Sequence, residues 1–148
     1  DAPQPELTPT HSLSVSLAQG VRLIGYDLES QRAEPGQTIP LTLYWESSGP
    51  LDDDYTVLVH VMTPEGTLVG QGDGPPLDGA YPTSYWGYGD RLVDRHEIMI
   101  ASDAPPGNVS IYAGLYDLDS DQRLPVQSAD VFYEDNRILI DTLVLADR

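Results

Sequence analysis

Residues 38–45 read TIPLTLYW, and every second side chain in this stretch is large and apolar: Ile39, Leu41, Leu43 and Trp45. Successive side chains of a β-strand point to opposite faces of the sheet, so this alternation predicts a strand with one buried face. Pro40 has no backbone N–H to donate to a neighbouring strand. We therefore expect this strand to lie at a sheet edge, or to be unpaired near its start.

The same kind of stretch recurs along the chain. Residues 11–17 alternate so that Leu13, Val15 and Leu17 share one face, and residues 109–117 alternate again. Residues 55–62 are apolar on both faces, which predicts a central strand. The 13 glycines and 13 prolines lie mainly between such runs. The chain is therefore predicted to be all-β, an immunoglobulin-like or fibronectin III-like antiparallel β-sandwich of about seven to nine strands. We expect a Pro-rich leader or linker over residues 1–12 and a single domain over residues 13–148.

The composition excludes several classes of function. Seven arginines, no lysine and 24 acidic residues give a formal net charge of −17, which excludes nucleic-acid binding by phosphate neutralisation. The absence of cysteine excludes disulfides, thiolate nucleophiles and Cys-ligated zinc. No apolar run is long enough to span a bilayer. No catalytic motif stands out either, so we expect the chain not to be an enzyme.

The one long connection, residues 72–90, is rich in aromatic and acidic side chains. Sugars present apolar faces that stack on aromatic rings, and carboxylates accept hydrogen bonds from their hydroxyl groups. The loop therefore predicts a glycan-binding site, with Tyr85 and Trp86 as stacking platforms. Its candidate residues are Tyr81, Tyr85, Trp86, Tyr88, Asp78 and Asp90. The alternative is that these rings fold the loop back over the sheet.

Two further motifs have a structural and a functional interpretation. Asp117, Asp119 and Asp121 have the alternating spacing of calcium loops, but the twelfth position is Ser128 rather than Glu, which excludes an EF-hand. A polar hairpin turn is the alternative, and calcium is the one cofactor that the sequence suggests. Asn108 begins an Asn-Val-Ser glycosylation sequon.

A set of short phrases, taken in order, resembles a known family. They are RLIGYDL (22–28), PGQT (35–38), LYW (43–45), DYTV (54–57), QGDGPP (71–76), YPTS (81–84), PPG (105–107), GLYD (114–117) and RLPV (123–126). They resemble the C-terminal extracytoplasmic β-sandwich module of Chloroflexi membrane proteins of the glycosyltransferase family 39 type, over residues 20 to about 145. The YWGYG stretch at 85–89 departs from that family, which usually has Pro-Gly after the tryptophan. The chain is more distantly similar, in strand layout, to the immunoglobulin-like polysaccharide-binding domains of O-antigen exporters.

These observations predict a non-catalytic binding module at the cell surface or outside the cell, recognising a glycan through residues 78–90. The alternative is a structural subunit whose N-terminal strand, carrying Leu13, Val15 and Leu17, adds to the sheet edge of a neighbouring subunit. That alternative predicts a homo-oligomer assembling into a filament or array. A passive spacer beside a membrane enzyme is a third interpretation.

Overall fold

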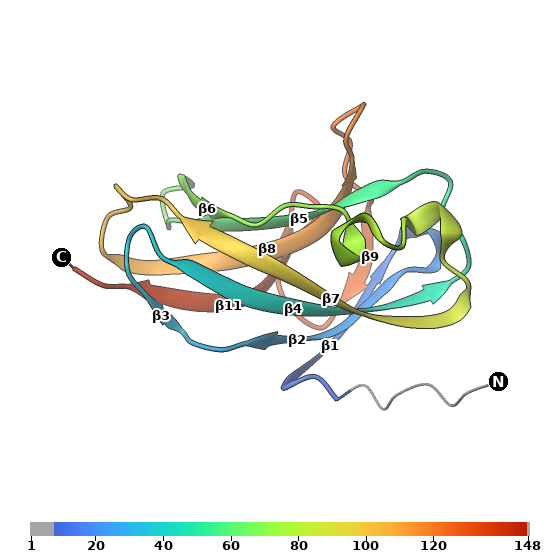
Figure 1. The fold of residues 1–148 in the computed structure, drawn as a ribbon, viewed down its shortest axis with the longest axis horizontal. Coiled ribbons are helices and arrows are strands. Elements are labelled where there is room, and N and C mark those ends of the chain that lie inside the picture. Colours follow the sequence, from blue (N-terminus) through green and yellow to red (C-terminus); the bar gives the residue numbers. More distant parts are fainter. Residues whose placement is uncertain (1–7, 148) are drawn as a thin grey trace.

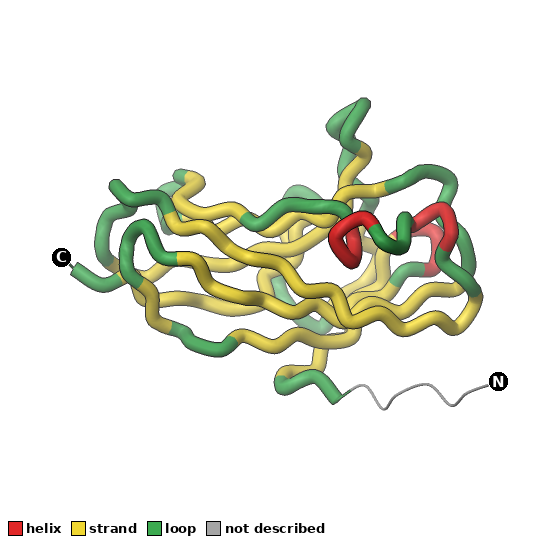
Figure 2. Tube along the Cα trace, viewed as in Figure 1, coloured by secondary structure: helices red, strands yellow, loops and turns green. Residues whose placement is uncertain are grey.

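The computed structural model describes residues 8–147, and β-strands make up most of this range (Figure 2). The strands are β1 (His11–Leu17), β2 (Arg22–Leu28), β3 (Arg32–Ala33), β4 (Thr38–Ser48), β5 (Tyr55–Met62), β6 (Leu68–Gln71), β7 (Tyr88–Ile100), β8 (Gly107–Asp117), β9 (Val126–Ala129), β10 (Tyr133–Glu134) and β11 (Arg137–Leu145). The helical segments are the 3-10 turns η1 (Ala18–Gly20), η2 (Pro76–Gly79) and η3 (Thr83–Tyr85). The all-β prediction is confirmed. Residues 1–7 of the expected leader lie outside the described residues, and β1 begins within its last two positions.

The strands form one hydrogen-bonded sheet in the order β10-β11-β8-β5-β6-β7-β4-β2-β1-β9, with β3 added beside β11. The long strands run along the longest axis of the molecule (Figure 1). Their pairing is antiparallel except between β3 and β11. The central position predicted for residues 55–62 is confirmed, because β5 lies between β6 and β8.

The two end strands of this order, β9 and β10, are consecutive in the chain. Only residues 130–132 join them, and a link of that length spans at most about 15 Å. The two ends of the sheet therefore lie close together, so the sheet curls into a half-barrel. The prediction of a sandwich of seven to nine strands is wrong in this respect. Residues 8–147 form eleven strands, and β6 connects β5 to β7 by hydrogen bonds where a sandwich has two separate sheets.

The curled sheet encloses one hydrophobic core, in which Trp45 and Trp86 are the largest fully buried side chains. The proline in β4 is accommodated by the register of its neighbours. β4 pairs with β2 on one side and β7 on the other, but β2 ends opposite Leu41. At Pro40, β4 therefore has a partner on the β7 side only. Near its start the strand is thus unpaired on its β2 side alone, and along the rest of its length it is not at a sheet edge.

Strand β7 and the segment before it place the candidate site. From Arg91 to Ile100 the side chains of β7 alternate strictly between exposed and buried. The segment 72–87, which contains η2 and η3, links β6 to β7 and lies on the β5 and β7 side of the sheet (Figure 1). Within residues 8–147, no helix has both the length and the apolar character needed to cross a bilayer.

Candidate functional site

The aromatic loop does not present its rings together. Trp86 is 1% exposed, and its Nε1–H donates to the carbonyl oxygen of Tyr81 at 2.9 Å. The indole is thus part of the core and cannot stack on a sugar without leaving it. The expectation that Trp86 is a stacking platform is corrected here, and the alternative, a ring that folds the loop over the sheet, describes this residue.

The other loop residues divide into two groups. Tyr81 donates its hydroxyl hydrogen to Asp90 Oδ2, which also accepts from the backbone N–H of Gly87 at 2.7 Å. The bond to Asp90 and partial burial raise the pKa of Tyr81 above its ordinary value. Tyr85 and Tyr88 are 72% and 89% exposed, and Asp78 is exposed. Tyr81 and Asp90 therefore stabilise the loop, while Tyr85, Tyr88 and Asp78 face solvent.

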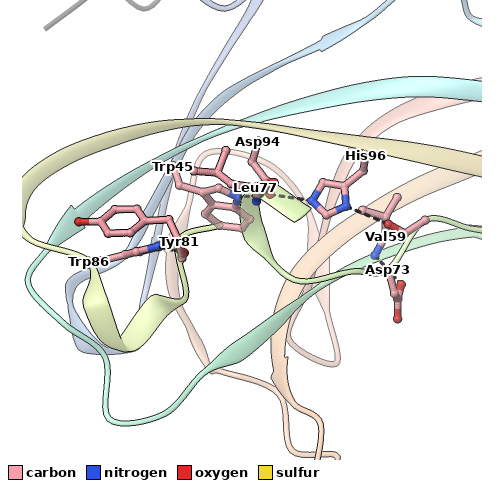
Figure 3. A network of polar contacts seen from close by, with 9 residues as sticks. Trp45, Val59, Asp73, Leu77, Tyr81, Trp86, Asp94 and His96 are labelled. Carbon is pink, nitrogen blue, oxygen red and sulfur yellow. Dashed lines mark hydrogen bonds and ion pairs between the residues drawn. The ribbon is translucent and has the colours of Figure 1, made fainter. Parts of the chain in front are cut away.

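Beneath this loop lies a buried polar pair that sequence reasoning missed. Asp94 is 0% exposed and His96 is 6% exposed, both on the inward face of β7. Asp94 accepts hydrogen bonds from Trp45 Nε1 at 3.1 Å and from the backbone N–H of Leu77 at 2.9 Å. His96 Nε2 lies 2.6 Å from Asp94 Oδ2, and His96 Nδ1 lies 3.0 Å from the carbonyl oxygen of Gly72. Figure 3 shows these side chains between the strand and the segment that they hold.

The hydrogen positions in this pair follow from its partners. The Gly72 carbonyl can only accept, so His96 Nδ1 carries a hydrogen. One further hydrogen then lies between His96 Nε2 and Asp94 Oδ2. Written as imidazolium and carboxylate or as two neutral groups, the pair has no net charge. This makes its burial tolerable, because each polar atom has a partner and no isolated charge is left in the core.

The pair fixes one side of the segment 72–77, and β5 fixes the other. Asp73 Oδ1 accepts from the backbone N–H of Val59 at 2.8 Å, and Gly74 exchanges two backbone hydrogen bonds with Val57. Burial alone would raise the pKa of Asp73, but His60, whose Nε2 lies 3.7 Å from Asp73 Oδ1, and the hydrogen bond from Val59 outweigh burial and lower it. The segment is thus tied to β5 and β7 at Gly72, Asp73, Gly74 and Leu77.

The next turn of this segment is conformationally strained. Leu77 and Asp78 have φ values of 53° and 55°, in the left-handed region that non-glycine residues rarely adopt. Two successive residues in this region cost free energy, and such strain is found at ligand-binding sites more often than elsewhere. The hydrogen bond from Leu77 N–H to buried Asp94 holds the turn in place.

Between this turn and the outer face of β7 is a groove made of two adjoining cavities. The larger, of about 520 Å³, is lined on one side by Asp73 and Asp78 and on the other by Arg95 and Glu97. The second, of about 390 Å³, extends past Tyr81, Asp90 and Arg91. Leu77 and Val93 line both cavities. Apolar walls with a few convergent polar groups are typical of sites for small polar ligands.

The acidic loop at residues 117–121 does not form a cation site. Asp117 accepts from Ser120 Oγ at 2.8 Å and from the backbone N–H of Asp119 at 3.3 Å, as in a polar turn. Over the described range, no three side chains of His, Asp or Glu converge in a way that could hold a metal ion. Asp117, Asp119 and Asp121 thus form a polar turn in this structure, and calcium binding by the chain stays a prediction.

The N-terminal strand is paired within the chain. β1 pairs with β2 on one side and β9 on the other, and Val15 and Leu17 are fully buried while Leu13 packs against the core from a partly buried position. Its backbone is thus engaged on both edges, and the expectation that it adds to another subunit is not met in this structure.

Asn108, the sequon residue, is exposed near the start of β8. Its side chain is therefore accessible.

The residues that the sequence analysis missed had one recognisable signal. Asp94 and His96 occupy the same alternation positions as Leu92 and Ile98, which the strand pattern places inward. Two polar residues on the buried face of a strand indicate a satisfied polar pair in the core. Arg95 and Glu97 carried no comparable signal, because charged residues on an exposed face are common.

Comparison with known proteins supports the fold. No family model and no curated protein matches the sequence. A solved structure titled "Crystal structure of the C-terminal domain of wzt" matches with a TM-score of 0.61 and 13% sequence identity, over 95% of this chain and 83% of that chain. At this identity the likeness shows the fold alone. It supports, at the level of strand arrangement, the distant resemblance to domains of O-antigen exporters.

Proposed function

We propose that this chain is a non-catalytic saccharide-binding module, and that its ligand lies in the groove between the segment 72–78 and β7. The observation that carries the proposal is the strained turn at Leu77 and Asp78, held against the groove by the buried carboxylate of Asp94. A wall fixed in advance in this way lowers the entropy cost of binding.

The chemistry of the groove favours a hydroxyl-rich ligand. Asp78 on the loop wall and Glu97 on the strand wall line the larger cavity as hydrogen-bond acceptors, and Arg95 supplies donors. Leu77 and Val93 offer apolar surface for the C–H faces of a sugar. The exposed rings of Tyr85 and Tyr88 are available for stacking further along the same loop. The binding surface proposed here is therefore centred on the groove, with Trp86 as its buried support.

The likeness to the wzt domain and the resemblance to polysaccharide-binding domains of exporters support the same proposal through the fold. The relation to the Chloroflexi surface module, and with it an extracytoplasmic location, belongs to the proposal as well. No observation in the described residues favours the alternative of assembly through the N-terminal strand.

The test is a glycan array probed with the purified chain, with and without calcium, beside two double variants. Asp78→Ala/Glu97→Ala removes one acceptor from each wall of the groove. Glu65→Ala/Asp119→Ala removes the same charge from exposed positions elsewhere. We expect saccharide binding by the wild type and by the second variant, and a loss of at least about tenfold in affinity for the first. An array without signal, or equal binding by both variants, would overturn the proposal.

A further inference from the structure

The two cavities of the groove adjoin each other along β7. They share Leu77 on the loop wall and Val93 on the strand wall. Together they extend along β7 from Asp90 to Glu97, and seven steps of an extended strand correspond to roughly 20 Å. A site of that length is too long for a single sugar ring and fits a chain of several linked sugars.

The polar groups are distributed over both cavities. The cavity at Asp73 and Asp78 has the exposed carboxylate of Asp78 on the loop side and the pair Arg95–Glu97 on the strand side. The cavity at Tyr81 has Asp90 and Arg91. Each cavity can therefore hydrogen-bond a different unit of a bound chain, while the apolar surface at the junction contacts the link between them.

The charged residues of the groove favour an uncharged saccharide as the ligand. Each of the two arginines that line the groove is already paired with a carboxylate of the protein. Arg91 Nε lies 2.9 Å from Glu46 Oε2, and Arg95 Nη2 lies 3.4 Å from Glu97 Oε1. An anionic sugar would have to compete with these carboxylates for the arginines while approaching a protein of net charge −17. A neutral sugar meets no such repulsion.

Resting on the proposed function, we infer that the groove takes an uncharged oligosaccharide that lies along β7 with sugar units in both cavities. The junction at Val93 is then the position that connects the two subsites. Affinity should grow with chain length until both cavities are filled, and it should depend little on salt.

The junction can be blocked with a matched pair of variants. Val93 and Met99 are both exposed and lie on the same face of β7. Val93 lines both cavities of the groove, whereas Met99 lines neither of them. Val93→Trp fills the junction with an indole ring, and Met99→Trp places the same ring outside the groove. Neither change removes a core side chain, so both variants should fold.

The experiment measures affinity by calorimetry for neutral glucose, mannose and galactose oligomers of one, two and four units, and for uronic-acid oligomers of the same lengths. We expect the neutral tetramers of one sugar type to bind at least about tenfold more tightly than the monomer, and the matching uronic acids to bind more weakly. Val93→Trp should abolish this gain with length, and Met99→Trp should keep it.

Affinity that is independent of chain length, a gain that survives Val93→Trp, or tighter binding of the uronic acids would overturn the inference and leave the proposed function standing. Absence of binding by every neutral and anionic saccharide to the wild type would overturn both.

Discussion

At the residue scale, the two tryptophans have the same role in the core, but only one of them is predictable from the local sequence. Trp45 is predicted by strand alternation to be buried, and it is. Trp86 lies in a loop, where alternation gives no information, and its surroundings suggested a binding surface. The structure buries both, and the indole N–H of each finds an acceptor, in Asp94 and in the carbonyl oxygen of Tyr81.

Replacement of Trp86 by alanine should therefore reduce stability. Removing a fully buried indole leaves a cavity, and we expect the free energy of unfolding to fall by about 3–5 kcal/mol. The neighbouring Tyr88→Ala removes a ring that is almost wholly exposed and should change this free energy by less than about 0.5 kcal/mol. Urea denaturation followed by circular dichroism measures both, and equal effects of the two variants would contradict the assignment of Trp86 to the core.

The buried pair of Asp94 and His96 makes a second prediction. Asp94→Asn keeps the size of the side chain but turns one acceptor oxygen into a donor, so a donor from Trp45, Leu77 or His96 loses its partner. We expect a loss of about 1–3 kcal/mol in the free energy of unfolding. The exposed Asp103→Asn has the same chemistry and is the control. Urea midpoints that shift equally in the two variants would show that the pair has no special role.

The tyrosine Tyr44 makes a pH-dependent prediction. Tyr44 donates to Asp27 Oδ2 at 2.5 Å, and this bond together with partial burial raises the pKa of Tyr44 from 10.0 to about 12. A raised pKa in the folded state means that the stabilisation is complete below the pKa of the unfolded chain and is lost as the pH rises through about 12. The stability difference between wild type and Tyr44→Phe should therefore shrink as the pH rises above about 10. Urea titrations at several pH values measure it, and a constant difference would contradict the prediction.

At the scale of elements, β1 shows why a surface-like strand pattern is ambiguous. Alternating Ser with Leu or Val can pair with any open sheet edge, in the same chain or another. In this structure β2 pairs with one edge of β1 and β9 with the other. Asp130, in the segment after β9, also accepts a hydrogen bond from the backbone N–H of Ser14 at 3.0 Å. The strand thus belongs to the fold of its own chain.

A chain shortened to begin at Ala18 should therefore lose cooperative unfolding, because β2 and β9 lose their shared partner and the core loses Val15 and Leu17. The milder Leu17→Ala keeps the strand and should lower the free energy of unfolding by about 2–5 kcal/mol. Thermal and urea unfolding curves test both. An unchanged unfolding curve for the shortened chain would mean that β1 is dispensable and free to pair elsewhere.

At the scale of the whole molecule, the net negative charge dominates the electrostatic contribution to stability. Twenty-four acidic residues against seven arginines leave most surface carboxylates without a cation nearby, and their mutual repulsion destabilises the compact state. Salt screens this repulsion over about 10 Å at 0.1 M ionic strength. The melting temperature should therefore rise between low salt and about 0.5 M sodium chloride. Differential scanning calorimetry measures it, and a melting temperature that falls with salt would show that attractive ion pairs outweigh the repulsion.

What the sequence determined by itself was the strand content. Alternation placed most strands close to where they lie, and the apolar character of residues 55–62 identified the central strand, because these are local patterns that any sheet must satisfy. Sequence reasoning could also locate the loop that borders the site, since residues 72–90 form the longest connection. It could not place the individual side chains of that loop.

The curl of the sheet, the burial of Trp86 and the groove depend on tertiary contacts that no local pattern predicts. The link between β9 and β10 is short, but it brings the sheet ends together only because β9 and β10 are the two end strands of the sheet. That strand order is set by pairing between segments distant in the sequence. Asp78 and Glu97 are nineteen positions apart in the chain and line the same cavity because Asp94 and His96 hold the intervening segment against β7. Such contacts depend on where distant segments meet, and a local pattern of residues carries no record of that.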